Sequence, residues 1–257
     1  MDEIRLAEMR ALGEQNEETR GQWYTIAVSL YWYARSMTGM VTDARTGSRR
    51  GRGGGGGDVV KIYQMATAGL GVEEEKQVQR RLKEAILKTS ILYGIPKSLQ
   101  ALLPLFATLD NDRIDHYGPR TEKKNNKEPL SVRQERARAY FDTLWTPAAA
   151  QANREKNFKY QPDLYLLNLE MIYELWISET DILDPVETQC CNAVALICSG
   201  SPVQAMWHTR GIVRHGGTLP VAKFALGIGL GVAEMYGLDT EKVVKVDDIP
   251  FDDTTPH

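Results

Sequence analysis

Apolar residues recur at spacings of three and four along most of this chain, which is the period of an amphipathic helix. The clearest case is the segment 72–90, whose acidic first turn suits the positive end of a helix dipole. Its apolar face consists of Val78, Leu82, Ala85, Ile86 and Thr89. The aromatic segment 23–37 also indicates a buried helix, with a strand as the alternative. No other segment favours a strand, so the sequence predicts an all-α fold.

Capping residues and glycines divide the rest of the chain into helices. Asp184, Pro185 and Glu187 form a capping-box pattern, with an acid at the N-cap, proline next and glutamate at the third helical position. Glycine ends a helix at Gly200 and again at Gly216. Residues 1–20 are expected to form a frayed helix or an arm. Further helices are expected over 58–68, 97–107, 131–144, 163–178, 185–199, 202–215 and 218–236.

Three glycines at alternate positions, Gly227, Gly229 and Gly231, lie inside the last of these helices. They do not form a dinucleotide-binding fingerprint, because no strand precedes them and the third glycine of that motif would fall on Val232. Small residues at close helix crossings are the better explanation.

Two segments of the chain resemble each other at an offset of 106 residues. In 91–96 and in 197–202 a helix ends at glycine, one residue intervenes, and proline opens the next helix. We therefore expect two degenerate copies of one unit, at about 58–108 and 180–237, within a single domain 1–257. At this offset His208 corresponds to Leu102, so only the second copy carries polar chemistry.

Two stretches predict loops. The segment 46–57 is rich in glycine and arginine and cannot form a core, so a flexible insertion is expected. An RNA-binding Arg-Gly segment is the less favoured alternative, because no aromatic residues are interleaved. The segment 108–130 is a polar loop.

Composition restricts the class of protein. The chain has 257 residues, 42% of them apolar and 25% charged, with a net charge of −3. These values are typical of a globular protein and give no argument for a nucleic-acid partner. The longest apolar run, 224–236, has 13 residues and contains Glu234, so no membrane partner is expected. The N-terminus lacks a signal-like apolar region, and a cytoplasmic location is expected.

The most informative stretch of sequence is 206–218, because it places two of the four histidines and two arginines beside apolar helical turns. His208 titrates in the range that suits a general acid or base. His215 lies seven residues later on the same helical face, whereas Arg210 lies about 200° from His208 on an ideal helix. Arg210 or Arg214 could bind a carboxylate as a fork. The alternative for His208 is a purely structural histidine.

The second copy resembles the carboxymuconolactone decarboxylase branch of the AhpD-like family. The resemblance rests on Glu187, the small apolar helix 193–197, Pro202, His208 with Arg210–Gly211, and the run Gly216–Gly217–Thr218. It implies an all-helical unit that forms homo-oligomers (a dimer, trimer or hexamer) with a site between helices. The first copy is similar to the first half of two-copy, fungal-type members.

The hydroperoxidase branch of that family carries a C-x-x-C four residues before its histidine. If His208 is that histidine, the two thiol positions fall on Ser201 and Gln204, and the family's upstream glutamate falls on Gln189 rather than Glu187. Peroxidase chemistry is therefore disfavoured, because no thiolate can attack or resolve there. The three cysteines, Cys190, Cys191 and Cys198, are expected to be small buried hydrophobes.

Two functions from different classes remain. The first is a cofactor-independent, metal-free lyase or isomerase acting on a small carboxylated or lactone metabolite in aromatic catabolism or secondary metabolism. Here His208 and Glu187 are the catalytic candidates, and the substrate-binding candidates are Arg210, Arg214, His215, Trp207 and Ser201. The second is a non-catalytic helical scaffold that has lost its site. An enzyme predicts a closed pocket of a few hundred Å³ that reaches His208 and is lined by at least one further ionisable group. A scaffold predicts His208 in solid packing.

Overall fold

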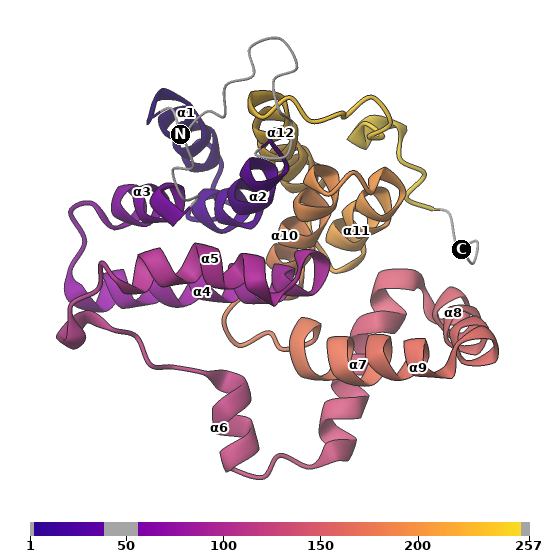
Figure 1. The fold of residues 1–257 in the computed structure, drawn as a ribbon. Coiled ribbons are helices and arrows are strands. Elements are labelled where there is room, and N and C mark those ends of the chain that lie inside the picture. Colours follow the sequence, from indigo (N-terminus) through magenta and orange to yellow (C-terminus); the bar gives the residue numbers. More distant parts are fainter. Residues whose placement is uncertain (1–2, 39–55, 253–257) are drawn as a thin grey trace.

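A computed structural model describes residues 3–38 and 56–252 of the chain, with the backbone alone for 31–38 and 56. Within these residues the protein is built from helices and contains no strand (Figure 1), which confirms the all-α prediction. Residues 46–55 of the predicted Gly/Arg loop lie outside the described part, whereas Gly56 and Gly57 already belong to a helix.

Helices account for most of the described residues. In the first half of the chain they are α1 (Glu3–Glu14), α2 (Trp23–Thr38), α3 (Gly56–Thr67), α4 (Val72–Tyr93), α5 (Ile95–Phe106), the 3₁₀ turn η1 (Asn111–Arg113) and α6 (Pro119–Asn125). In the second half they are α7 (Leu130–Trp145), α8 (Pro147–Tyr160), α9 (Pro162–Tyr165), the π-helix η2 (Leu166–Ile177), α10 (Pro185–Cys198), α11 (Pro202–Arg214), α12 (Leu219–Met235) and the 3₁₀ turn η3 (Val246–Asp248).

The observed helices begin and end close to the expected positions, with three differences. Helix α6 lies inside the segment expected to be a polar loop. Helix α8 was not expected, because its sequence is mostly polar and only a narrow face, including Ala149 and Ala150, is buried. The segment expected as one helix over 163–178 is a short α-helix followed by the wider π-helix η2.

Helix α10 is the centre of the fold. Every side chain from Glu187 to Cys198 is buried, and the helix packs against α2, α4, α11 and α12. The expected capping box is present, since the Glu187 amide donates to Asp184 at 2.8 Å and the Asp184 amide donates back to the Glu187 carboxylate at 3.1 Å. A helix surrounded in this way needs small or apolar side chains on every face, which its Cys- and Ala-rich sequence supplies.

One of the three alternate glycines in α12 lies at a close helix crossing. A Cβ added at Gly229 would lie 3.2 Å from both Val194 and Ile197 on α10. Gly227 and Gly231 face open space instead. The close-crossing explanation therefore holds for Gly229 alone.

A second, smaller apolar cluster lies outside the main core. It is formed by α7, α8 and η2, and Trp207 of α11 packs against it. In Figure 1, helices α6 to α9 occupy the lower part of the view, below α10 and α11. The buried members of this cluster are Ala137, Tyr140, Phe141, Leu144, Trp145, Ala149, Ala150, Tyr173 and Ile177.

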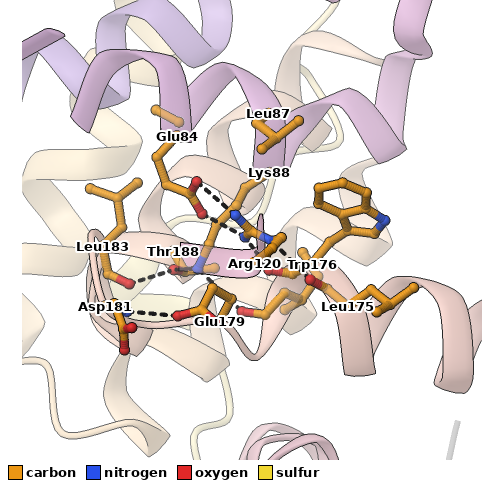
Figure 2. Close-up of polar contacts among 12 residues, drawn as sticks. Glu84, Leu87, Lys88, Arg120, Leu175, Trp176, Glu179, Asp181, Leu183 and Thr188 are labelled. Carbon is orange, nitrogen blue, oxygen red and sulfur yellow. Dashed lines mark hydrogen bonds and ion pairs between the residues drawn. The ribbon is translucent and has the colours of Figure 1, made fainter. Parts of the chain in front are cut away.

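Buried and partly buried charges connect this second cluster to the main core (Figure 2). Arg120 of α6 makes a two-pronged ion pair with Glu84 of α4, at 2.6 and 2.9 Å. The same guanidinium donates to the carbonyls of Leu175 and Trp176, both at 2.8 Å. Because the last carbonyls of a helix have no partner within it, Arg120 satisfies the end of η2 and holds it beside α4.

Lys88 completes this connection from the middle of α4. Its side chain is fully buried, and its ammonium donates to the Ile177 carbonyl at 3.2 Å and to the Thr188 hydroxyl of α10 at 2.6 Å. Lys88 thus links α4, η2 and α10. Burial lowers the pKa of Lys88 to about 8, although the charge of Glu84 opposes this change.

We predict that Lys88 makes the free energy of unfolding depend on pH in the alkaline range. A lysine whose pKa falls from 10.5 to about 8 on folding holds its proton more weakly in the folded than in the unfolded protein. The free energy of unfolding should therefore rise, relative to Lys88→Met, by about 1 kcal/mol per pH unit above pH 8. Urea denaturation of both proteins at pH 7 to 9.5 measures this difference. Lys124→Met, at an exposed lysine, should run parallel to the wild type, and parallel curves for Lys88→Met would contradict the prediction.

Candidate functional site

A pocket of about 280 Å³ opens between α11 and the second apolar cluster, and His208 lies in its wall. Helices α7, α8 and α11 and the π-helix η2 all contribute to it. The lining residues are Phe141, Trp145, Asn153, Lys156, Asn157, Asn168, Tyr173, Gln204, Trp207 and His208. The wall is thus aromatic on one part and rich in amides on another, with lysine as its one charged residue.

A chain of hydrogen bonds behind the pocket orients His208. The Nδ1 of His208 lies 2.7 Å from the Oε1 of Gln189, whose amide nitrogen donates to the Tyr140 hydroxyl at 2.8 Å. In this orientation of the amide its oxygen can only accept, so Nδ1 of His208 carries the proton. The lone pair of the neutral imidazole is then on Nε2.

His208 of α11 and His215, the residue that caps the end of α11, are both electrically neutral near pH 7. Burial lowers the pKa of His208 to about 4, and the charge of His215 contributes to the decrease. Burial also lowers the pKa of His215 to about 4, while Asp184 opposes it. The His215 ring packs with its centroid 4.3 Å from that of Tyr140, so His215 contacts the residue whose hydroxyl receives the hydrogen bond of Gln189. The expectation that the two histidines share a helical face agrees with this placement.

Gly211 lets α11 approach Gln189 closely. A Cβ added at Gly211 would lie 2.8 Å from the Oε1 of Gln189 and would contact the Cδ1 of Leu144 more closely still. Real Cβ atoms do not approach side chains so closely, so any other residue at this position would require the side chain of Gln189 or Leu144 to move.

Of the remaining substrate-binding candidates, one lines the pocket and the others lie outside its lining. Trp207 lines the pocket beside His208. Arg210 is only 2% exposed, and neither Arg210 nor Ser201 is among the lining residues. Arg214 donates to the carbonyl of Leu144 at the end of α7, at 2.9 Å. The hydroxyl of Ser201 receives a hydrogen bond from Ser199 at 3.2 Å.

Glu187 occupies a place apart from the pocket lining. Besides its capping box, its carboxylate forms an ion pair with Arg81 of α4, which also donates to the Tyr24 hydroxyl at 2.9 Å. Arg81 and Glu187 are 106 residues apart, the same offset as the two helix–Gly-x-Pro–helix segments. In this position Glu187 connects α10 to α4 through Arg81 and caps the N-terminus of α10. Both contacts fix the first turn of α10, and therefore the position of Gln189 two residues later.

The three cysteines are buried and free. Burial raises the pKa of Cys191 to about 11 and that of Cys198 to about 12, and it also raises the pKa of Cys190. These thiols therefore stay protonated near neutral pH and behave as small apolar side chains.

Gln189, Tyr140 and all lining residues except Trp207 and His208, Lys156 among them, were not sequence candidates. Gln189 carried one signal, since the family resemblance places its upstream glutamate at this position. Tyr140 and Lys156 carried none, because they lie on α7 and α8 in the segment between the two expected copies. The candidates that the structure does bring together are His208, Trp207 and His215.

Comparison with known proteins yields two distant relatives. Peroxisomal protein 2 of Schizosaccharomyces pombe is 22% identical over 158 residues, which cover 62% of this chain and 71% of the relative. Peroxisomal protein 2 of Saccharomyces cerevisiae is 21% identical over 192 residues, covering 67% and 68%. No family model and no solved structure matches the chain. Among the described helices, none is long and apolar enough to cross a membrane.

We predict that Gly211→Ala disrupts the site from behind. The added methyl group must displace Gln189 or Leu144, and overpacking of this kind costs about 1–3 kcal/mol of stability. Denaturant unfolding measures the loss. The matched control is Gly227→Ala, where nothing lies within 4 Å of the new Cβ and the helix should be unchanged or slightly more stable. Equal stabilities of the two variants would show that the α11–α10 contact tolerates a side chain.

We also predict the protonation state of His208. The ¹⁵N resonances of its ring should show a neutral imidazole with the proton on Nδ1 from pH 7 down to about pH 5, because its pKa is about 4. In Gln189→Glu a carboxylate replaces the amide next to Nδ1 and favours the imidazolium, so the titration midpoint should rise. A wild-type midpoint near the ordinary histidine value of 6.5 would contradict the burial of this ring.

Proposed function

We propose that this protein is a cofactor-independent lyase or isomerase that moves a proton on a small carboxylated or lactone metabolite. The observation that carries the proposal is a neutral histidine, held by Gln189 and facing a pocket of about 280 Å³. The resemblance of the second copy to carboxymuconolactone decarboxylases supports the same class of reaction. The size of the pocket and its second ionisable group, Lys156, support an enzyme over a scaffold, for which solid packing around His208 is expected. The pocket differs from the closed one expected of an enzyme, because it is open to solvent on one side.

The neutral state of His208 makes it a base in the resting protein. Its Nε2 would take a proton from a carbon next to a carbonyl group, and the C–H electron pair would move onto the carbonyl oxygen to give an enolate. In the resulting imidazolium, Nδ1 still donates its hydrogen bond to the Oε1 of Gln189, and the dipole of this amide stabilises the positive charge. Where a C=C bond adjoins the deprotonated carbon, the charge of the enolate extends over that bond. Return of the proton from Nε2 to the far carbon of the bond then shifts the double bond and completes an isomerisation.

A decarboxylation would use the same residue as an acid. The bond to the carboxyl carbon breaks, its electron pair enters the conjugated system, and a protonated His208 delivers the proton to carbon. Burial disfavours the protonated form of His208 in the free protein. Isomerisation, which starts from the neutral form, is therefore the better match to this site, and an anionic ligand would raise the pKa of His208 toward the working range.

The other residues of the candidate set take supporting roles in this proposal. Glu187 positions α10 through its capping box and through Arg81, and it acts at a distance from the substrate. His215 and Tyr140 pack against each other behind Gln189. Trp207 contributes to the substrate-binding wall.

Homo-oligomer formation belongs to the same proposal. Helix α5 exposes an apolar stripe at spacings of three and four residues, and a second copy of this chain would cover such a stripe. Its members are Ile95, Leu99, Leu103 and Phe106. The two relatives are named for the peroxisome, so we propose that location beside the cytoplasmic one, and a fluorescent fusion imaged in cells distinguishes them.

The central test is solvent deuterium exchange. Carboxylated lactones incubated with the protein in D₂O should gain deuterium next to the carbonyl group, as followed by ¹H NMR, with or without release of CO₂. His208→Ala should slow the exchange by about 10²–10⁴-fold, the usual contribution of a general base. His116→Ala removes an exposed histidine remote from the pocket and should exchange at the wild-type rate. Equal rates for wild type and His208→Ala would remove His208 from the reaction.

A further inference from the structure

The pocket has a composition that selects among small anions. Four aromatic side chains contribute to its wall, with Trp145 and Trp207 at 5.1 Å between ring centroids and Phe141 and Tyr173 at 4.7 Å. Both pairs meet edge to face, with interplanar angles of 68° and 90°. Aromatic walls of this kind make their best contacts with the flat faces and edges of other conjugated rings.

The volume of the pocket sets the size of the ligand. An apolar cavity of about 150 Å³ accommodates benzene. The pocket beside His208 measures about 280 Å³, roughly twice as much, and it is open to solvent on one side. A ligand of about two fused rings, or of one ring with a short conjugated chain, matches this space.

The polar part of the wall comes mainly from α8. Lys156 is the only charged residue among the lining residues, is exposed, and forms no ion pair within the described part of the chain. Asn153 and Asn157 flank it on the same helix and are joined by a hydrogen bond of 2.6 Å. A single cation flanked by amides attracts one anionic group and provides hydrogen bonds around it.

We propose that the pocket binds a flat, conjugated carboxylate of about two rings, with the rings against Trp145 and Trp207 and the carboxylate on Lys156. This inference rests on the proposed function for the choice of a carboxylated ligand. It replaces Arg210 and Arg214, the arginines expected from the sequence to bind the carboxylate, by a lysine from the segment between the two expected copies.

The position of the carboxylate has a consequence for the reaction. Loss of CO₂ moves negative charge away from the carboxylate, so a cation bound there stabilises the reactant more than the transition state. Proton transfer at another carbon leaves the carboxylate charge in place. A carboxylate bound to Lys156 therefore stays on the ligand, and His208 acts on a different carbon.

The test compares two probes of the same shape, 2-naphthoate and the neutral 2-naphthamide, by isothermal titration calorimetry. The wild type should bind the carboxylate about tenfold more tightly than the amide, the effect of one charge-assisted hydrogen bond at a partly exposed site. Lys156→Gln should remove this difference, and Lys156→Arg should keep most of it. Lys159→Gln removes the same charge one turn later on α8, outside the pocket lining, and should bind like the wild type.

The place of binding is checked by NMR of the tryptophan indole N–H groups. 2-Naphthoate should shift the signals of Trp145 and Trp207, which line the pocket, and leave that of Trp23, which is buried in the main core. Equal affinities of the wild type for both probes, an equal effect of Lys159→Gln, or no binding of either probe would each overturn the proposal.

The two proposals fail in different ways. If His208→Gln binds 2-naphthoate as the wild type does and no lactone exchanges deuterium, the carboxylate site stands and the proposed reaction falls. If deuterium exchange depends on His208 while Lys156→Gln leaves the preference for the carboxylate unchanged, the reaction stands and the assignment of Lys156 falls.

Discussion

The fully buried charge of Lys88 and the partly buried charge of Arg120 are the constraint on which the rest of the structure depends. A lysine without solvent is costly unless its protons find partners, and here these are the Ile177 carbonyl and the Thr188 hydroxyl. Arg120 meets the same requirement at Glu84 and at the last carbonyls of η2. Because buried polar groups tolerate few alternative arrangements, these contacts specify one position of η2 against α4 and α10.

That position determines the pocket. The end of η2 sets the place of Tyr173, and Thr188 immediately precedes Gln189, which binds His208. Glu187, on the other side of Thr188, is held by Arg81 from the same helix that carries Lys88. The two walls of the pocket, α11 on one side and α7, α8 and η2 on the other, are therefore aligned through polar contacts that lie outside it. These polar residues therefore determine the position of His208, although none of them lines the pocket.

Charge at the site follows from burial rather than from residue type. In water His208 and His215 would both gain a proton as the pH falls through 6.5, whereas burial lowers the pKa of each to about 4 and keeps both neutral down to about pH 5. Lys156 stays at the exposed part of the same pocket and supplies the one charge. The pocket thus combines a neutral imidazole from α11, a single cation from α8 and an aromatic wall, and these are the features on which the proposed function rests.

The sequence by itself determined the helices, because their period, caps and glycine stops are local patterns within a few residues. It also located His208 and Trp207, and the spacing of the resembling family pointed to Gln189. It missed α8, whose buried face is too narrow to stand out. Only the tertiary structure decided that Tyr140 and Lys156 belong to the site and that Glu187 does not line it. These assignments depend on contacts between segments far apart in the chain, such as the hydrogen bond of Gln189 to Tyr140 across 49 positions, and no local pattern encodes such a pairing.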